Sequence, residues 1–104
     1  MNTILFIDTT SNEIIKVGLI INGEEHSVEQ NLDKKKAQAL LPLIEKILKE
    51  KKLKLQDISG IQVNPGPGSF TGIRVGLTIA NTLAFLLKVP LNGKPVGEMI
   101  DPIY

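Results

Sequence analysis

Two segments of the chain carry residues whose types and spacing could do chemistry, and the first is Asp8-Thr9-Thr10-Ser11. A carboxylate followed by three hydroxyl groups could hold a hydrated metal ion and a phosphate, because hard cations take oxygen ligands. The run follows the apolar residues 3–7, and ligands of open α/β sheets bind outside the carboxyl ends of the strands. A polar β-turn is the simpler interpretation of the same four residues. We therefore expect at most a vestigial phosphate loop at Asp8, Thr9, Thr10 and Ser11.

The second segment is the loop 65–72, which is dense in glycine and proline and leads into an apolar helix. Its glycines would let the backbone approach a ligand closely, and the N–H groups of a helix N-terminus attract anions. The loop is not a P-loop, since no Gly-Lys-Ser/Thr follows it, and its prolines stiffen it and donate no N–H group. We expect a structural loop that comprises Gly66, Pro67, Gly68, Ser69, Phe70 and Thr71.

Individual side chains of this loop have specific roles in that interpretation. Ser69 or Thr71 should cap the following helix by accepting a hydrogen bond from a first-turn N–H group. Phe70 should fill a pocket beside the loop or in a partner. Arg74, one turn into the helix, could pair with an anion, and a solvated surface arginine is the simpler interpretation.

The composition excludes several classes of active site. Cysteine is absent and His26 is the only histidine among 104 residues, so the chain has no thiol nucleophile, no zinc–thiolate site and no pair of imidazole ligands. A two-metal nuclease needs several converging carboxylates. Asp8 ends the first strand, but the strand before the glycine-rich loop ends in Asn64. We therefore expect no catalytic residue, no metal and no cofactor in this chain.

The elements that position these segments follow from hydrophobic periodicity and turn residues. Asn22-Gly23 between two strand-like runs predicts a hairpin with a type I′ turn, which needs a positive φ at both residues. Asp33 can cap the first helix, and Pro42 inside it predicts a kink or a late start. The expected elements are strands 3–7, 14–21 and 24–30, a helix with apolar positions from 37 to 48, a strand over 58–63, a helix over 73–87 and a strand over 89–91.

This β-β-β-α-β-α-β order predicts an α/β fold with a mixed five-stranded sheet and two main helices. Right-handed crossovers restrict where the helices can pack on such a sheet. The ribonuclease-H-like half of the actin-like ATPases has the same order of elements.

The second expected helix carries a strip of small residues at intervals of four. Such a strip lets another backbone approach closely. No charged residue occurs from Val75 to Leu87, so both faces of the helix must be covered. We expect the sheet to cover one face and a second chain to contact the strip, with the first helix as the alternative cover. The expected partner interface comprises Gly72, Gly76, Ala80, Leu83 and Ala84.

Charge and hydropathy restrict the partners further. Residues 34–54 hold eight lysines and two acids, whereas the whole chain has a net charge of only +1. A solvated helix face is the simpler interpretation of these lysines, and an anionic partner is the alternative. No aromatic residue lies between these lysines, so the segment has no platform on which bases could stack. Contact between the lysines and the phosphates of a nucleic acid is the one form of RNA binding that stays open. The uncharged run Val75–Leu87 is too short to span a membrane, and the N-terminus lacks the features of a signal peptide, so we expect a cytoplasmic protein.

The run from Gly66 to Gly76, Gly-Pro-Gly-Ser-Phe-Thr-Gly-Ile-Arg-Val-Gly, strongly resembles the signature of the TsaB (YeaZ) family. Ile7-Asp8-Thr9-Thr10 resembles the start of that family, and Leu40-Leu41-Pro42 is similar to its Leu-Leu-Pro helix. Together these motifs lie within residues 3–93. The resemblance implies a ribonuclease-H-like, actin-like ATPase half-fold. We expect residues 1–104 to form a single TsaB-like N-terminal domain, without the second domain of the family.

The resemblance also implies a role in making threonylcarbamoyladenosine, a modified base of tRNA. TsaB proteins are not the catalyst there; they bind and support TsaD, a metal-dependent transferase, and the ATPase TsaE joins the assembly. The implied function is a non-catalytic partner or scaffold subunit of a TsaD-like transferase, with a TsaE-like ATPase as a further partner. We further expect indirect contact with tRNA, a homodimer in isolation and no membrane contact.

Two alternatives stay open. One is a nucleotide-binding or nucleotide-hydrolysing domain of the actin-like ATPase type. The other is a homodimeric remnant that contacts RNA directly through the lysine-rich helix.

Overall fold

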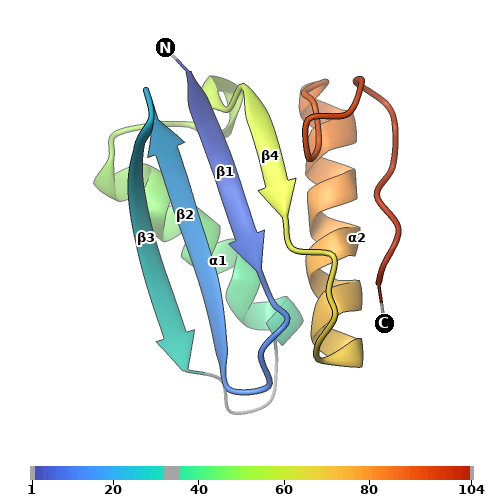
Figure 1. The fold of residues 1–104 in the computed structure, drawn as a ribbon. Coiled ribbons are helices and arrows are strands. Elements are labelled where there is room, and N and C mark those ends of the chain that lie inside the picture. Colours follow the sequence, from blue (N-terminus) through green and yellow to red (C-terminus); the bar gives the residue numbers. More distant parts are fainter. Residues whose placement is uncertain (1, 32–35, 104) are drawn as a thin grey trace.

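The computed structural model describes residues 2–31 and 36–103. Its elements are β1 (Thr3–Asp8), β2 (Ile14–Ile21), β3 (Glu24–Asn31), α1 (Lys36–Glu50), the short 3₁₀ helix η1 (Leu55–Asp57), β4 (Gly60–Val63) and α2 (Phe70–Leu87). The strands form one mixed sheet in the order β3-β2-β1-β4, in which β1 is antiparallel to β2 and parallel to β4 (Figure 1). The predicted α/β class is confirmed, but the sheet has four strands and not five.

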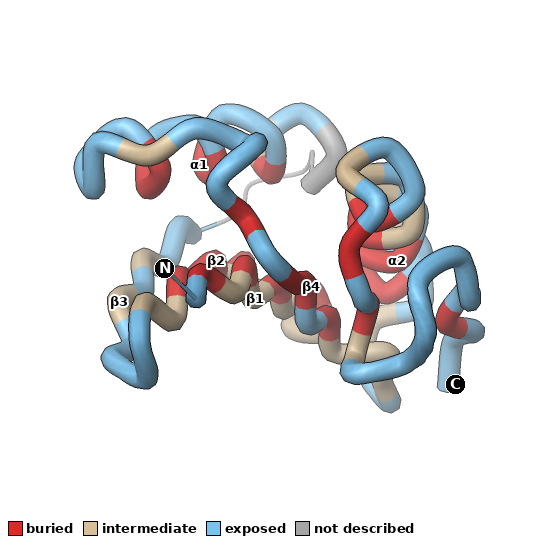
Figure 2. Tube along the Cα trace, turned by 90° about the horizontal axis from the view of Figure 1, so that it is seen from above, coloured by how far each residue is buried: buried red, intermediate tan, exposed pale blue. Residues whose placement is uncertain are grey.

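The two faces of the sheet differ in burial, because side chains alternate along each strand. Leu5 and Ile7 of β1 and Val17 and Leu19 of β2 point into the core. Both α1 and α2 lie on this side of the sheet (Figure 2). Residues at helical spacing turn α1 toward the same core: Leu40, Leu43, Ile44, Ile47 and Leu48. This packing fixes where β1 and β4 end, and with them the two segments expected to carry chemistry.

The hairpin between β2 and β3 is confirmed. Asn22 and Gly23 have φ values of 51° and 87°, as a type I′ turn requires. The turn pairs Ile21 with Glu24 and leaves β3 at the edge of the sheet. The polar sequence of β3 suits this edge position.

The expected fifth strand at residues 89–91 is wrong, because only Leu91 forms a bridge, to Ile61. The Ile61 N–H donates to the Pro90 carbonyl at 2.9 Å, and the Asn92 N–H donates to the Ile61 carbonyl at 2.8 Å. Beyond this point the Asn92 side chain takes the place of a strand: its Oδ1 accepts from the Val63 N–H, and its Nδ2 donates to the Val63 carbonyl. Asn92 also has a φ of 53°, which turns the chain away from the sheet.

The helix boundaries differ from the expected ones. α1 begins at Lys36 and continues through Pro42, so the late start is wrong; its buried leucines and isoleucines hold both halves on the sheet and offset the missing backbone hydrogen bond. The proposed cap Asp33 lies outside the described residues. α2 begins at Phe70, three residues before the expected start at Ile73, because Ser69 caps it.

Candidate functional site

The carboxylate of Asp8 ends β1 and is occupied by donors of its own chain. Asp8 Oδ1 accepts hydrogen bonds from the Thr10 backbone N–H at 2.9 Å and from the Thr10 hydroxyl at 2.7 Å. Asp8 Oδ2 accepts one from Asn64 Nδ2 at 3.1 Å. Burial raises the pKa of Asp8, but these hydrogen bonds and the nearby Lys16 outweigh it and place the pKa below its ordinary value. The carboxylate is therefore ionised near neutral pH and closes a hydrogen-bonded turn.

The hydroxyl groups that follow Asp8 are also engaged within the chain. Thr9 is fully buried, and its hydroxyl donates to the carbonyl of Gly72 at 2.5 Å. Ser11 Oγ accepts from the backbone N–H groups of Glu13 and Ile14, at the entry to β2. Within residues 2–31 and 36–103, no three His, Cys, Asp or Glu side chains come together as a metal site requires. The geometry is that of the polar turn, the simpler of the two interpretations above.

The glycine-rich loop packs on this turn with its own backbone. The Ser69 N–H donates to the Thr10 carbonyl at 2.7 Å. A Cβ at Gly68 would overlap that carbonyl, and a Cβ at Gly66 would overlap the carbonyl of Ile103. Two other segments of the chain thus lie directly against the loop at Gly66 and Gly68. This geometry supports the prediction of a structural loop.

The predicted N-cap of α2 is confirmed, since Ser69 Oγ accepts a hydrogen bond from the Gly72 N–H at 3.2 Å. The prediction for Phe70 is wrong within this chain: the side chain is 56% exposed, and the Arg74 guanidinium lies 5.4 Å from its ring centroid. Phe70 is the first residue of α2, and it borders a groove on the outward side of the helix. Contact between Phe70 and a partner stays a prediction.

The glycines and alanines of the small-residue strip on α2 face inward, where other segments of this chain cover them. The strip's four glycines and alanines are buried, Leu83 beside them is half-buried, and the residues concerned are Gly72, Gly76, Ala80, Leu83 and Ala84. The physical reason is the turn after β1, which packs against the helix: a Cβ at Gly76 would overlap the hydroxyl oxygen of Thr9. Spacing alone identified the strip but not the Thr9 side chain of the same chain that packs against it.

α2 is long and apolar enough, by length and composition alone, to cross a membrane. The helix is longer than the uncharged run Val75–Leu87, and the expectation that no segment spans a membrane was based on that shorter run. A core helix passes the same test, and here one face of α2 is buried against β1 and β4. Such a helix is weak evidence of a membrane span.

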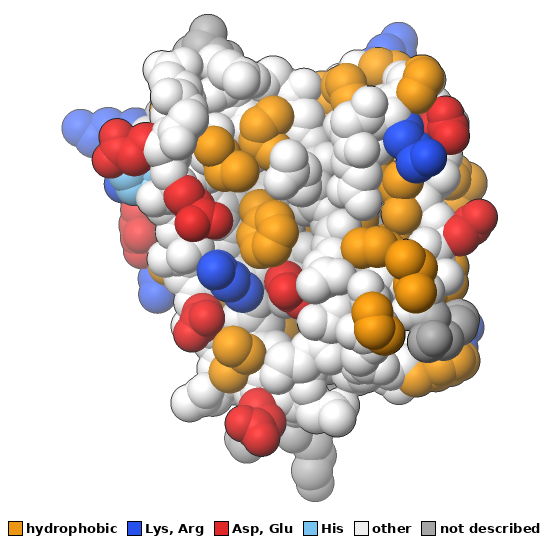
Figure 3. Space-filling view, in the orientation of Figure 1, with side chains coloured by type: hydrophobic (Ala, Val, Ile, Leu, Met, Phe, Trp, Pro, Cys, Tyr) orange, Lys and Arg blue, Asp and Glu red, His pale blue; other side chains and the backbone are white. Residues whose placement is uncertain are grey.

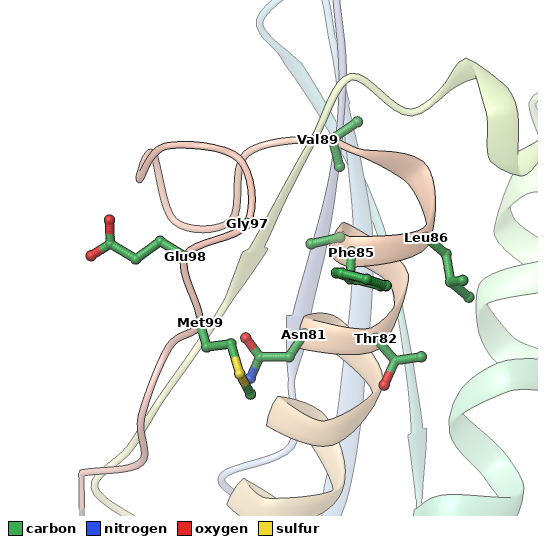
Figure 4. A pocket seen from close by; sticks show the side chains of 9 residues that line it. Asn81, Thr82, Phe85, Leu86, Val89, Gly97, Glu98 and Met99 are labelled. Atoms are coloured by element: carbon green, nitrogen blue, oxygen red, sulfur yellow. The ribbon is translucent and has the colours of Figure 1, made fainter.

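The outward side of α2 is bordered by three adjoining grooves, which the sequence did not reveal. One of about 390 Å³ lies near the start of the helix, between Phe70 and Ile79. One of about 340 Å³ is shared by Arg74 and Asn81 with the segment 99–102. One of about 380 Å³ lies at the end of the helix (Figure 4). Hydrophobic side chains gather over α2 and the segment beside it (Figure 3). Exposed apolar surface of this kind is typical of interaction sites.

The segment that borders these grooves is clamped to α2 through Asn81. Asn81 Nδ2 donates to the carbonyl of Ile100 at 3.1 Å, and the Ile100 N–H donates to Asn81 Oδ1 at 3.0 Å. Phe85 and Leu86 project from the last turns of α2, and Met99 extends from the facing segment toward the helix (Figure 4). The exposed fractions of Phe85 and Leu86 are 73% and 66%.

Comparison with known proteins identifies relatives of this fold. A protein-family model described as TsaD, tRNA N6-adenosine threonylcarbamoyltransferase, matches residues 28–94. The tRNA threonylcarbamoyladenosine biosynthesis protein TsaB of Haemophilus influenzae is 37% identical over 89 residues, and that of Escherichia coli is 36% identical over 90 residues; each alignment covers 86% of this chain. The solved structure of YeaZ from Pseudomonas aeruginosa superimposes with a TM-score of 0.82 at 33% identity over 91% of this chain. The chain spans only 37% to 44% of the length of these relatives.

Proposed function

Because the chain belongs to the TsaB (YeaZ) family, we propose that it is a non-catalytic partner subunit in the threonylcarbamoyladenosine modification of tRNA, and that it binds a TsaD-like transferase. The relatives are named as proteins of that biosynthesis, and the matching family model is described as the transferase. In this role the chain supports the complex, and the transferase catalyses the threonylcarbamoyl transfer.

The hydrogen bonds of the Asp8 carboxylate support a role without catalysis. Both carboxylate oxygens of Asp8 accept hydrogen bonds from Thr10 and Asn64. The glycine-rich loop is closed over this turn by the backbone of Thr10 and Ile103. An aspartate that activated a metal-bound nucleotide would need oxygens directed to the ligand. The observed turn holds two loops together instead.

The exposed apolar residues on the outward side of α2 support the binding of a partner protein there. Phe70, Phe85 and Leu86 are all more than half exposed on one helix. Grooves border that helix over its whole length. The buried face of α2 already has its cover, so the remaining apolar surface is what a partner would bury. In isolation, the same surface would let two copies of this chain pair as a homodimer.

The experiment that tests this proposal is co-purification with a TsaD-like transferase produced in the same cells. The variant Phe85→Asp places a charge on the exposed apolar surface without touching the core. Leu55→Asp is the matched control, because Leu55 is a partly exposed apolar residue of η1, on a different element. We expect Phe85→Asp to lose the complex and Leu55→Asp to keep it. A complex that survives Phe85→Asp, or a chain that never binds the transferase, contradicts the proposal.

The remaining partners follow from this role. A TsaE-like ATPase would join through the assembly, and tRNA would be contacted by the transferase and only indirectly by this chain. Since the substrate is tRNA, we place the protein in the cytoplasm.

A further inference from the structure

Arg74 is the only charged residue in the eighteen residues of α2. It is exposed, and among the described residues no carboxylate lies within 4 Å of it. Its guanidinium lies 5.4 Å from the centroid of the Phe70 ring, at a cation–π distance. The chain therefore presents a guanidinium supported by an aromatic ring and without an acidic partner of its own.

Arg74 lies where a partner on α2 would cover it. It lines the groove that begins at Phe70, together with Val75 and Ile79. It also lines the next groove, which α2 shares with the segment carrying Asp101. A partner that fills both grooves must pass over the guanidinium. Covering a charge without a counter-charge is strongly unfavourable, so the partner must supply one.

A second copy of this chain is a poor source of that charge. In a twofold contact of α2 with itself, each Arg74 would face a helix of the same sequence, which contains no acidic residue. The acids that border the grooves, Asp101 and Glu98, lie on the segment beside the helix. Glu98 is already within 3.7 Å of Lys94. Charge complementarity thus favours a partner of different sequence over a second copy.

We propose that Arg74 determines which partner binds α2, and that the occupant is a protein that presents an aspartate or glutamate carboxylate to its guanidinium. A carboxylate matches the fork of donors that a guanidinium presents and can bind it through two parallel hydrogen bonds. The ring of Phe70, with its centroid 5.4 Å from the guanidinium, supports that guanidinium within the chain. This inference rests on the proposed function, because it takes the TsaD-like transferase as the occupant.

The test compares two equilibria: the dissociation constant of the complex with the transferase, and that of the homodimer. The variants are Arg74→Met, Arg74→Lys and Arg74→Glu, with Lys49→Met as the control that removes an exposed cation from α1. We expect Arg74→Met to weaken the complex by about tenfold or more, since the partner's carboxylate loses its counter-charge. Arg74→Lys should retain part of the affinity, Arg74→Glu should lose more than Arg74→Met, and Lys49→Met should match the wild type.

The homodimer is the readout that separates specificity from general damage. Arg74→Met should leave it unchanged or tighten it, because two like charges are removed from the contact. Equal weakening of the homodimer and of the complex would overturn the inference and indicate pairing with Asp101 of the second copy. A complex unchanged by Arg74→Met but lost in Phe85→Asp would also overturn it, while the proposed function would stand. If neither variant changes the complex, the proposed function itself fails.

Discussion

The hydroxyl of Thr9 donates a hydrogen bond to the carbonyl oxygen of Gly72, a residue 63 positions further along the chain. This bond joins the turn after β1 to the first turn of α2, the two segments whose residues could do chemistry. Thr9 is fully buried, so the bond is formed without competition from water. The two segments are therefore coupled as parts of one packed junction.

Removal of the Thr9 hydroxyl should destabilise the fold. Thr9→Val keeps the shape of the side chain but removes the hydrogen bond from the Thr9 hydroxyl to the Gly72 carbonyl, which costs about 1 kcal/mol of the free energy of unfolding. Urea denaturation of the purified chain measures this change. Thr9→Ser is the control, because it keeps the hydroxyl and loses only a methyl group. Equal stability of Thr9→Val and the wild type would show that the bond contributes nothing.

A side chain at Gly76 should disturb the fold rather than an interface. Gly76→Ala would bring its Cβ into overlap with the Thr9 hydroxyl, and overpacking of this kind costs about 1–3 kcal/mol. Thermal unfolding measures the loss, with Thr78→Ala on the exposed side of α2 as the control. The double variant Thr9→Ala/Gly76→Ala removes the atom that clashes. It should be more stable than the sum of the single effects predicts, whereas strict additivity would place the clash elsewhere.

Much of the backbone was predictable because local signals agreed with the fold. Asn22-Gly23 specified the hairpin, and Ser69 specified the start of α2, since each acts within a few residues. The inward direction of the small-residue strip was not predictable, because a spacing of four defines a face but not the segment that packs against it. The loss of the fifth strand depends on two hydrogen bonds between Asn92 and Val63, which are distant in sequence.

The residues of the candidate site were predictable, but the contacts that close the site were not. The sequence placed Asp8 at the end of a strand and the glycines in a loop before a helix. It did not reveal that Asn64 reaches Asp8, or that Ile103 returns to the loop beside Gly66. Those contacts depend on tertiary packing, and they turn a possible ligand loop into a closed junction.

Thr3→Val should stabilise the protein. The Thr3 side chain is fully buried on the core side of β1, and within the described residues its hydroxyl oxygen has no hydrogen-bond partner. Replacing an unsatisfied buried hydroxyl by a methyl group of similar volume should raise the free energy of unfolding by about 1 kcal/mol. Thr78→Val, at an exposed position, controls for β-branched apolar replacement in general. A decrease in stability for Thr3→Val would show that the hydroxyl has a partner such as a buried water.

The stability of the chain should depend on the ionisation of Asp8. The pKa of Asp8 in the folded state lies below its ordinary value of 3.8, so the folded state favours the charged carboxylate. The resulting stabilisation is fully present above pH 3.8 and is lost as the pH falls through the lower, folded-state pKa. Asp8→Asn should therefore be less stable than the wild type at neutral pH and lose less stability on acidification. Urea midpoints measured from pH 7 to pH 2 decide this, and parallel curves for the two proteins would contradict it.

ATP should not bind at the junction of the two loops. The N–H of Thr10 donates to Asp8, that of Gly66 donates to Asn64 Oδ1, and that of Gly72 donates to Ser69. The Ser69 N–H donates to the Thr10 carbonyl, and prolines contribute no N–H group, so several of the donors that a phosphate would need are already bonded within the chain. The carboxylate of Asp8 adds a negative charge that repels a triphosphate. Amide resonances of residues 8–11 and 66–74 should therefore not shift during titration with ATP and Mg²⁺ to millimolar concentration. Saturable shifts confined to these residues in the wild type, and lost in Gly68→Ala, would show that the junction opens to bind a nucleotide.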